Sequence, residues 1–170
     1  YRWFEAHAAP GSDTFKALLY GSAYGFSRSA KELVKFVVRT EVDFGQILTA
    51  PFTMVNAYSA HSYGVQDQMP QGVATPTTGD EPREPFFPVT LPVPTAGLLT
   101  DINFLAVYPT NAANLNRSRS REVNDHFLAR DILNLSTRTS VSFDTSVQNP
   151  TYSDPACTVC HIRMDPIAGA

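Results

Sequence analysis

The chain has 170 residues, a formal net charge of -3, and 43% hydrophobic and 17% charged residues. This length and composition are typical of a globular protein with one sizeable core or two small ones. The slightly negative charge gives no electrostatic basis for binding nucleic acid or an anionic membrane, and no apolar run approaches the roughly 18 residues of a transmembrane helix. The chain begins YRWFEAHAAP, without the basic and apolar stretches of a signal peptide, so we expect a segment of a longer protein or a chain matured by cleavage.

Residues 1–65 have a helical pattern. In SRSAKELVKFVVRT, Glu32 lies three residues after Ser29, which is the spacing of a capping box, and Leu33 and Phe36 then fall on one face. We therefore expect a helix whose cap is Ser29 or Ser27.

The stretch DFGQILTAPFTMVNAYSAHSYG, still within residues 1–65, predicts two further helices. Asp43 would open the first, Pro51 would break the chain, and the second would run from Met54 through His61. Gly64 is the expected terminator because glycine adopts the left-handed conformation that ends many helices.

Residues 66–96 contain most of the prolines. Proline at this density excludes a helix and a central strand, so we expect a long loop over the surface of the protein. Phe86 and Phe87 would anchor this loop to the body.

Residues 97–170 return to apolar spacing. The run INFLAVY could be a helix or a buried extended segment, while Val123, Phe127, Ile132 and Leu135 predict a helix from Ser120 onward. Together the regions 1–65, 66–96 and 97–170 predict a mainly α fold in one compact unit.

The stretch DPACTVCHIRMDP contains both cysteines of the chain. Cys157 and Cys160 lie three residues apart and His161 follows directly, which is the pattern that attaches c-type haem. The two thiols would add to the haem vinyl groups as thioethers, and His161 would be the proximal iron ligand. The sequence therefore predicts one covalently bound haem c in a small helical domain.

Two other chemistries use a CxxC motif. Zinc needs four ligands, and His161 would be a third, while His7, His61 and His126 are isolated in the sequence. A redox dithiol normally lies at a helix start beside a strand pattern, which is missing here. The nearby Arg117, Arg119 and Arg121 could hold haem propionates, although such a run is more often a solvated helix start.

Three segments resemble the planctomycete-type cytochrome c family, which consists of large exported bacterial haem proteins. They are LVKFVVRTEVDFGQILTAPFTMVNAYSAHSYG, GLLTDINFLAVYPTNAANLNRSRSREV and DPACTVCHIRMDPIAGA, and they occur in the family's order over most of residues 33–166. The last is similar to the family pattern D-P-A-C-x-x-C-H-x-x-M-D-P-x-G almost residue for residue. The resemblance implies haem attachment and a periplasmic or extracellular location.

The sixth ligand of the iron must come from the side opposite His161. Met164 lies three residues after His161 and so shares its face of a helix, which excludes it. The remaining candidates are His7, His61, His126, Met54 and Met69. We select His61, because it follows an amphipathic turn and matches a histidine in the resembling segment.

These features predict a c-type cytochrome that transfers electrons within an exported complex. Its partners would be redox proteins or neighbouring haem subunits, and it would be more an electron carrier than a catalyst. The alternative is a haem enzyme or a small-ligand-binding domain with an open sixth position, and a third option is a subunit of an extracellular or membrane-attached assembly. A histidine or methionine as sixth ligand would favour electron transfer.

Overall fold

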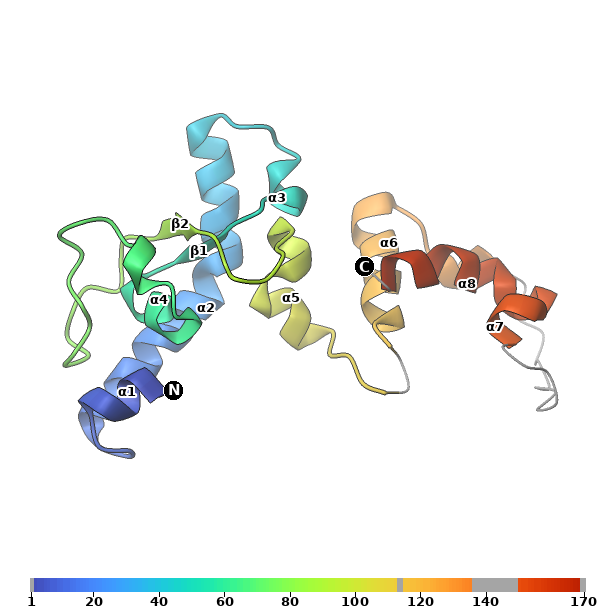
Figure 1. The fold of residues 1–170 in the computed structure, drawn as a ribbon. Helices are drawn as coiled ribbons and strands as arrows, with labels where there is room; N and C mark the ends of the chain where they lie inside the picture. The colour runs from blue at the N-terminus through green and yellow to red at the C-terminus, as the bar shows by residue number, and fades with distance from the viewer. Residues whose placement is uncertain (1, 113–114, 136–149, 169–170) are drawn as a thin grey trace. The chain divides into compact units, whose positions relative to one another are not determined.

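The computed structural model describes residues 2–112, 115–135 and 150–168, which are mainly helical, as the sequence predicts (Figure 1). The chain forms two compact units, unit 1 (Tyr1–Phe104) and unit 2 (Leu105–Ala170), where the sequence suggests one. The predicted regions 1–65 and 66–96 both fall in unit 1. None of the helices in the described ranges is long and apolar enough to cross a membrane.

Unit 1 contains α1 (Arg2–His7), α2 (Asp13–Thr40), α3 (Gln46–Thr49), β1 (Thr53–Val55), α4 (Ala57–Tyr63), the 3-10 helix η1 (Gln66–Gln68), β2 (Phe87–Val89) and the 3-10 helix η2 (Gly97–Thr100). Helix α5 (Ile102–Val107) begins in unit 1. Unit 2 continues with α6 (Arg117–Leu128), the 3-10 helix η3 (Ile132–Leu135), α7 (Pro150–Ser153) and α8 (Pro155–Ala168). The run INFLAVY, which the sequence leaves open, is therefore helical as far as Val107.

The long helix α2 begins much earlier than the sequence suggests. Its N-cap is Ser12, whose side chain accepts a hydrogen bond from the Phe15 N–H at 3.1 Å. The predicted cap Ser29 is instead buried in mid-helix, where its hydroxyl donates to Asp101 at 2.6 Å. Glu32 makes no capping box, because its carboxylate binds neighbouring basic side chains of α2.

Helix α4 packs closely against α2. A Cβ atom at Gly21 would overlap the ring of Tyr58, and one at Gly25 would overlap Asn56 and Ser59. The missing side chains at these two positions allow the two helices to approach. Asn56 and Ser59 also form the capping box that begins α4, and Gly64 ends it with a φ of 71°, as predicted.

The two strands form an antiparallel pair with Met54 opposite Pro88. This pair corrects two predictions. Met54 and Val55 lie in a strand rather than in a helix, because the helical cap comes later, at Asn56. The proline-rich segment also contributes a strand, since each strand of a two-stranded sheet is an edge, where proline is tolerated.

The rest of the proline-rich segment is held to unit 1 by specific contacts. The Glu81 carboxylate accepts hydrogen bonds from the N–H groups of Thr77, Thr78 and Gly79 at 2.7 to 3.0 Å. Burial alone would raise the pKa of Glu81, but these bonds outweigh it and lower the pKa to about 2. The hydroxyl of buried Tyr58 donates to the Glu81 carbonyl at 2.7 Å, so this loop is fastened to α4.

Apolar packing in unit 1 forms three buried clusters. The first joins α2, α3 and β1 through residues such as Leu33 and Met54, and Phe86 packs against it, as predicted for the anchor of the proline-rich loop. The second gathers around Val55 and Val89, and the third around Phe4, Leu18 and Tyr58.

In unit 2, α6 starts at Arg117, three residues before the predicted start. It ends at Leu128, and Ala129 caps it with a φ of 50°. Ile132 and Leu135 therefore lie in η3 rather than on the same helix as Phe127.

Candidate functional site

Helix α8 carries the predicted attachment motif. Proline at its first position suits a helix start, and the Asp154 carbonyl accepts the Cys157 N–H at 3.0 Å. Cys157 and Cys160 are both half-buried and neither forms a disulfide. Because side chains three residues apart lie on one face of a helix, the two thiols project from the same side of α8.

The second thiol contacts the short helix η3. The Cys160 Sγ lies 3.4 Å from the carbonyl oxygen of Ile132, a fully buried residue. A thiol is a weak hydrogen-bond donor, and a thioether sulfur donates none. Haem attachment would therefore give up only a weak contact.

A charged network surrounds His161. Its Nδ1 lies 3.0 and 3.1 Å from the two carboxylate oxygens of Asp165, one turn later on α8. The Arg117 Nε, on α6, donates to the same carboxylate at 2.9 Å. All three side chains are at least two-thirds buried. Burial alone would raise the pKa of Asp165, but the bonds from Arg117 and His161 outweigh it and lower the pKa.

This network decides which nitrogen of His161 is available to a metal. An ionised carboxylate only accepts hydrogen bonds, so the His161 Nδ1 carries the proton and donates. A metal would then be bound through the other ring nitrogen, Nε2. Among the described residues, none forms a hydrogen bond with Nε2.

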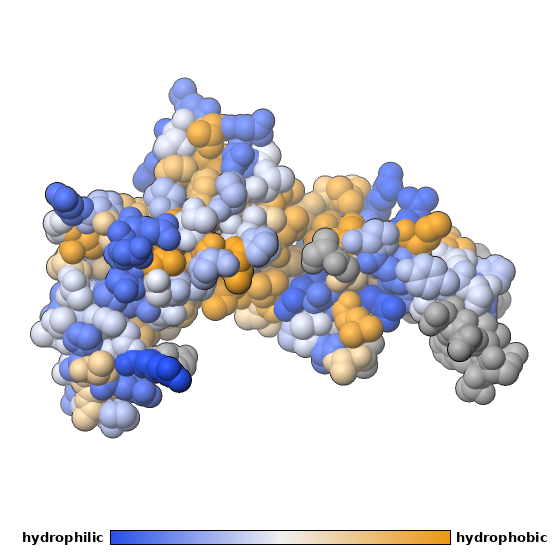
Figure 2. Space-filling model, viewed as in Figure 1, coloured by the Kyte–Doolittle hydropathy of each residue, from blue (hydrophilic) through white to orange (hydrophobic). Residues whose placement is uncertain are grey.

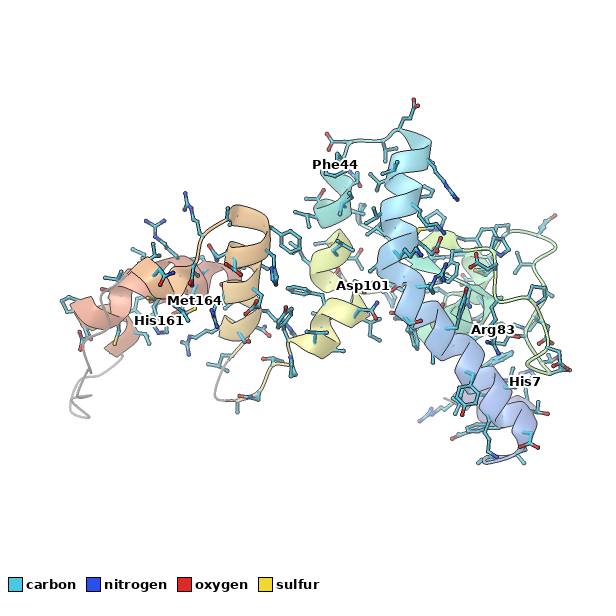
Figure 3. The ribbon with its side chains drawn as sticks, turned by 180° about the vertical axis from the view of Figure 1, so that it is seen from behind. His7, Phe44, Arg83, Asp101, His161 and Met164 are labelled. Atoms are coloured by element: carbon cyan, nitrogen blue, oxygen red, sulfur yellow. The ribbon has the colours of Figure 1, made fainter. Side chains whose placement is uncertain are left out.

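Helices α6 and α8 are joined by a further bond beside this network. The buried Ser120 hydroxyl on α6 donates to the Met164 carbonyl at 2.7 Å. Met164 lies on α8 with His161, as the argument against it as sixth ligand assumed (Figure 3).

The three arginines of α6 have different surroundings. Arg117 pairs with Asp165, and Arg119 donates to the carbonyls of Tyr108 and Leu105 at 2.6 and 3.1 Å. Arg121 is exposed. Two of the three are therefore engaged within unit 2, and the run is more than a solvated helix start.

His61, the predicted sixth ligand, lies in unit 1, whereas His161 lies in unit 2. Its ring stacks on Trp3 with centroids 3.8 Å apart, and His7 also stacks on Trp3, at 4.1 Å. The Nδ1 atom of His61 is buried and has no partner among the described residues. Burial, with a smaller contribution from His7, lowers the pKa of His61 to about 4. Its role as an iron ligand stays a prediction.

The other candidates for the sixth iron ligand differ in how exposed their side chains are. Met54 is buried in the first core cluster, and Met69 packs against the second. His126 is exposed on α6, where its Nε2 lies 3.3 Å from Glu122. Glu122, Asp125 and His126 could together approach a metal ion, but exposed acidic groups of this kind are common without one.

Apolar side chains in unit 2 are mostly not covered. Among the described residues of this unit, Ile132 is the one hydrophobic residue in the buried core. Orange apolar residues lie among blue hydrophilic ones on the face of unit 2 seen in Figure 2. The exposed large hydrophobic residues here are Val107, Leu115, Phe127, Leu128, Leu135, Tyr152, Val159 and Ile162. Such a set is expected where an apolar partner or group completes the packing.

Compared with known protein families, with curated proteins and with solved structures, the chain gives no match. The resemblance to the planctomycete-type cytochrome c family therefore stays a prediction from the quoted motifs. The CxxCH pattern identified three candidate site residues. Arg117 stood out only as one of three nearby arginines, and its pairing with Asp165 could not be read from the sequence, because the two residues are far apart along the chain.

Proposed function

We propose that the chain is a c-type cytochrome module that carries one covalently attached haem and transfers electrons within an exported complex. One observation carries the proposal: two free, half-buried thiols lie on one face of α8, next to a histidine whose Nδ1 is held by a carboxylate. Cys157 and Cys160 would form the thioethers, and His161 would bind the iron through Nε2.

The surroundings of the motif fit an apolar prosthetic group. When bound, haem supplies an iron that exchanges one electron. The protein would hold the ring through Cys157 and Cys160 and orient His161 through Asp165. A zinc site is less well supported, because the described residues gather no group of three or more possible ligand atoms at the motif, and zinc needs four.

A second candidate function is a haem enzyme or small-ligand-binding domain with an open sixth position. This function is favoured by the histidines that unit 2 offers as iron ligands. Besides His161, the unit contains His126, which is exposed. A histidine or methionine as sixth ligand would instead favour electron transfer. Carbon monoxide distinguishes the two, because it binds reduced haem readily when the sixth position is open.

The proposal is tested by producing the chain in a bacterial periplasm with a haem-attachment system. Absorption bands of a c-type haem that survive acid–acetone extraction are expected. The double variant Cys157→Ala/Cys160→Ala should lose its haem on extraction, whereas Thr158→Ala, between the cysteines, should keep it. Bound zinc without haem in the wild-type protein would refute the proposal.

A further inference from the structure

We infer that Asp165, braced by Arg117, is a positioning residue that lowers the reduction potential of the iron bound to His161. The inference rests on the proposed haem function and concerns a side chain that the attachment motif CxxCH does not include. The Asp165 carboxylate would lower the affinity of the bound iron for an electron.

The geometry points to a strong and persistent interaction. Both Asp165 oxygens lie within 3.1 Å of the His161 Nδ1, and the spacing of four residues places them on neighbouring turns of α8. The Arg117 Nε holds one of these oxygens from α6 at 2.9 Å. Side-chain exposures of 20% for His161 and 19% for Asp165 keep the pair largely away from water, which strengthens it.

A carboxylate acceptor changes what His161 does to a metal. Pulling on the Nδ1 proton makes the imidazole a more basic ligand through Nε2. A more basic ligand, together with a nearby negative charge, stabilises ferric over ferrous iron. The Arg117 guanidinium has the opposite charge, so it offsets part of this effect while it fixes the carboxylate.

The opposite charges of Asp165 and Arg117 lead to opposite predicted shifts in potential for a variant of each residue. Asp165→Asn retains the size of the side chain and a hydrogen-bond acceptor but removes the charge. We expect it to favour the reduced state about tenfold, which is a rise of about 59 mV for one electron. Arg117→Gln leaves the carboxylate free to attract the Nδ1 proton, so its potential should fall.

The test is redox titration of the purified haem-bound protein and its variants, after intact mass has shown covalent haem in each. Asp125→Asn is the matched control, because it removes an exposed carboxylate of α6 that does not contact His161. It should change the reduction equilibrium constant of the iron less than twofold. Asp165→Glu restores the charge and should return the potential toward that of the wild type.

The inference is overturned if the reduction equilibrium constant of Asp165→Asn stays within twofold of the wild-type value. It is also overturned if the potential of Asp165→Asn shifts no further than that of Asp125→Asn. If Asp165→Asn retains no haem, Arg117→Gln decides, and an unchanged potential in that variant overturns the inference. Absence of haem from the wild-type protein would instead count against the proposed function, so the two failures are distinguishable.

Discussion

At the scale of single residues, His61 and His161 show how surroundings decide what an imidazole can do. The Nδ1 of His161 has a carboxylate partner, whereas the Nδ1 of His61 is buried without a partner among the described residues. Burial keeps His61 neutral at pH 7, because it lowers the pKa to about 4. His161 is therefore oriented by charge, and His61 by aromatic stacking on Trp3.

Acidification from pH 7 to 4 should destabilise unit 1 through His61. Its pKa is about 4 in the folded protein against an ordinary value of 6.5, so the unfolded chain binds the proton first. The contribution to the free energy of unfolding is complete above about pH 6.5 and is lost as the pH falls toward 4. Trp3, the only tryptophan, stacks on His61 and reports on unfolding of this unit by fluorescence.

The variant His61→Gln isolates this effect. Denaturant unfolding of the variant should depend less steeply on pH between 7 and 4 than unfolding of the wild type, whereas the control His126→Gln, in unit 2, should retain the wild-type slope. Identical slopes for His61→Gln and the wild type would show that another group is responsible.

At the scale of elements, the sequence predicted helices well and their boundaries less well. The spacing of Ser29 and Glu32 fits a capping box, but Ser29 is a small buried residue at a packing contact, and local spacing does not distinguish the two. Strand β1 has three residues, too few for an alternating pattern to show. The glycine contacts of α2 are also invisible in the sequence, because they depend on α4.

Gly25→Ala should destabilise unit 1, although alanine favours a helix by about 1 kcal/mol over glycine. The added Cβ would meet the side chains of Asn56 and Ser59, which are buried and form the capping box of α4. We expect a net loss of about 1–2 kcal/mol in the free energy of unfolding from overpacking. Ser27→Ala, on the exposed side of the same turn, is the control and should stay within about 0.5 kcal/mol of the wild type. A stabilised Gly25→Ala would mean that the helices do not pack as described.

At the scale of the whole molecule, the two units differ in how they are packed. Unit 1 has three apolar clusters, whereas the described part of unit 2 buries Ile132 and leaves many large apolar side chains exposed. Apolar content alone could not reveal this difference, because the sequence contains hydrophobic residues in both units. The attachment motif, in contrast, was readable because its chemistry depends on local spacing in one helix.

Loss of covalent haem should therefore loosen unit 2 and leave unit 1 folded. In hydrogen exchange measured by mass spectrometry, Cys157→Ala/Cys160→Ala should lose protection in α6 and α8 relative to the haem-bound wild type. Protection in the buried part of α2 should be unchanged, because its packing partners lie in unit 1. Equal protection of α6 and α8 in both proteins would show that unit 2 needs no prosthetic group for its stability.

The central claim, that Cys157 and Cys160 attach haem, is tested most directly by the intact mass of the protein from a haem-attaching periplasm after acid–acetone extraction. The account predicts the polypeptide mass plus one haem, with the addition mapped to the peptide that contains both cysteines. A mass equal to that of the polypeptide alone would contradict it.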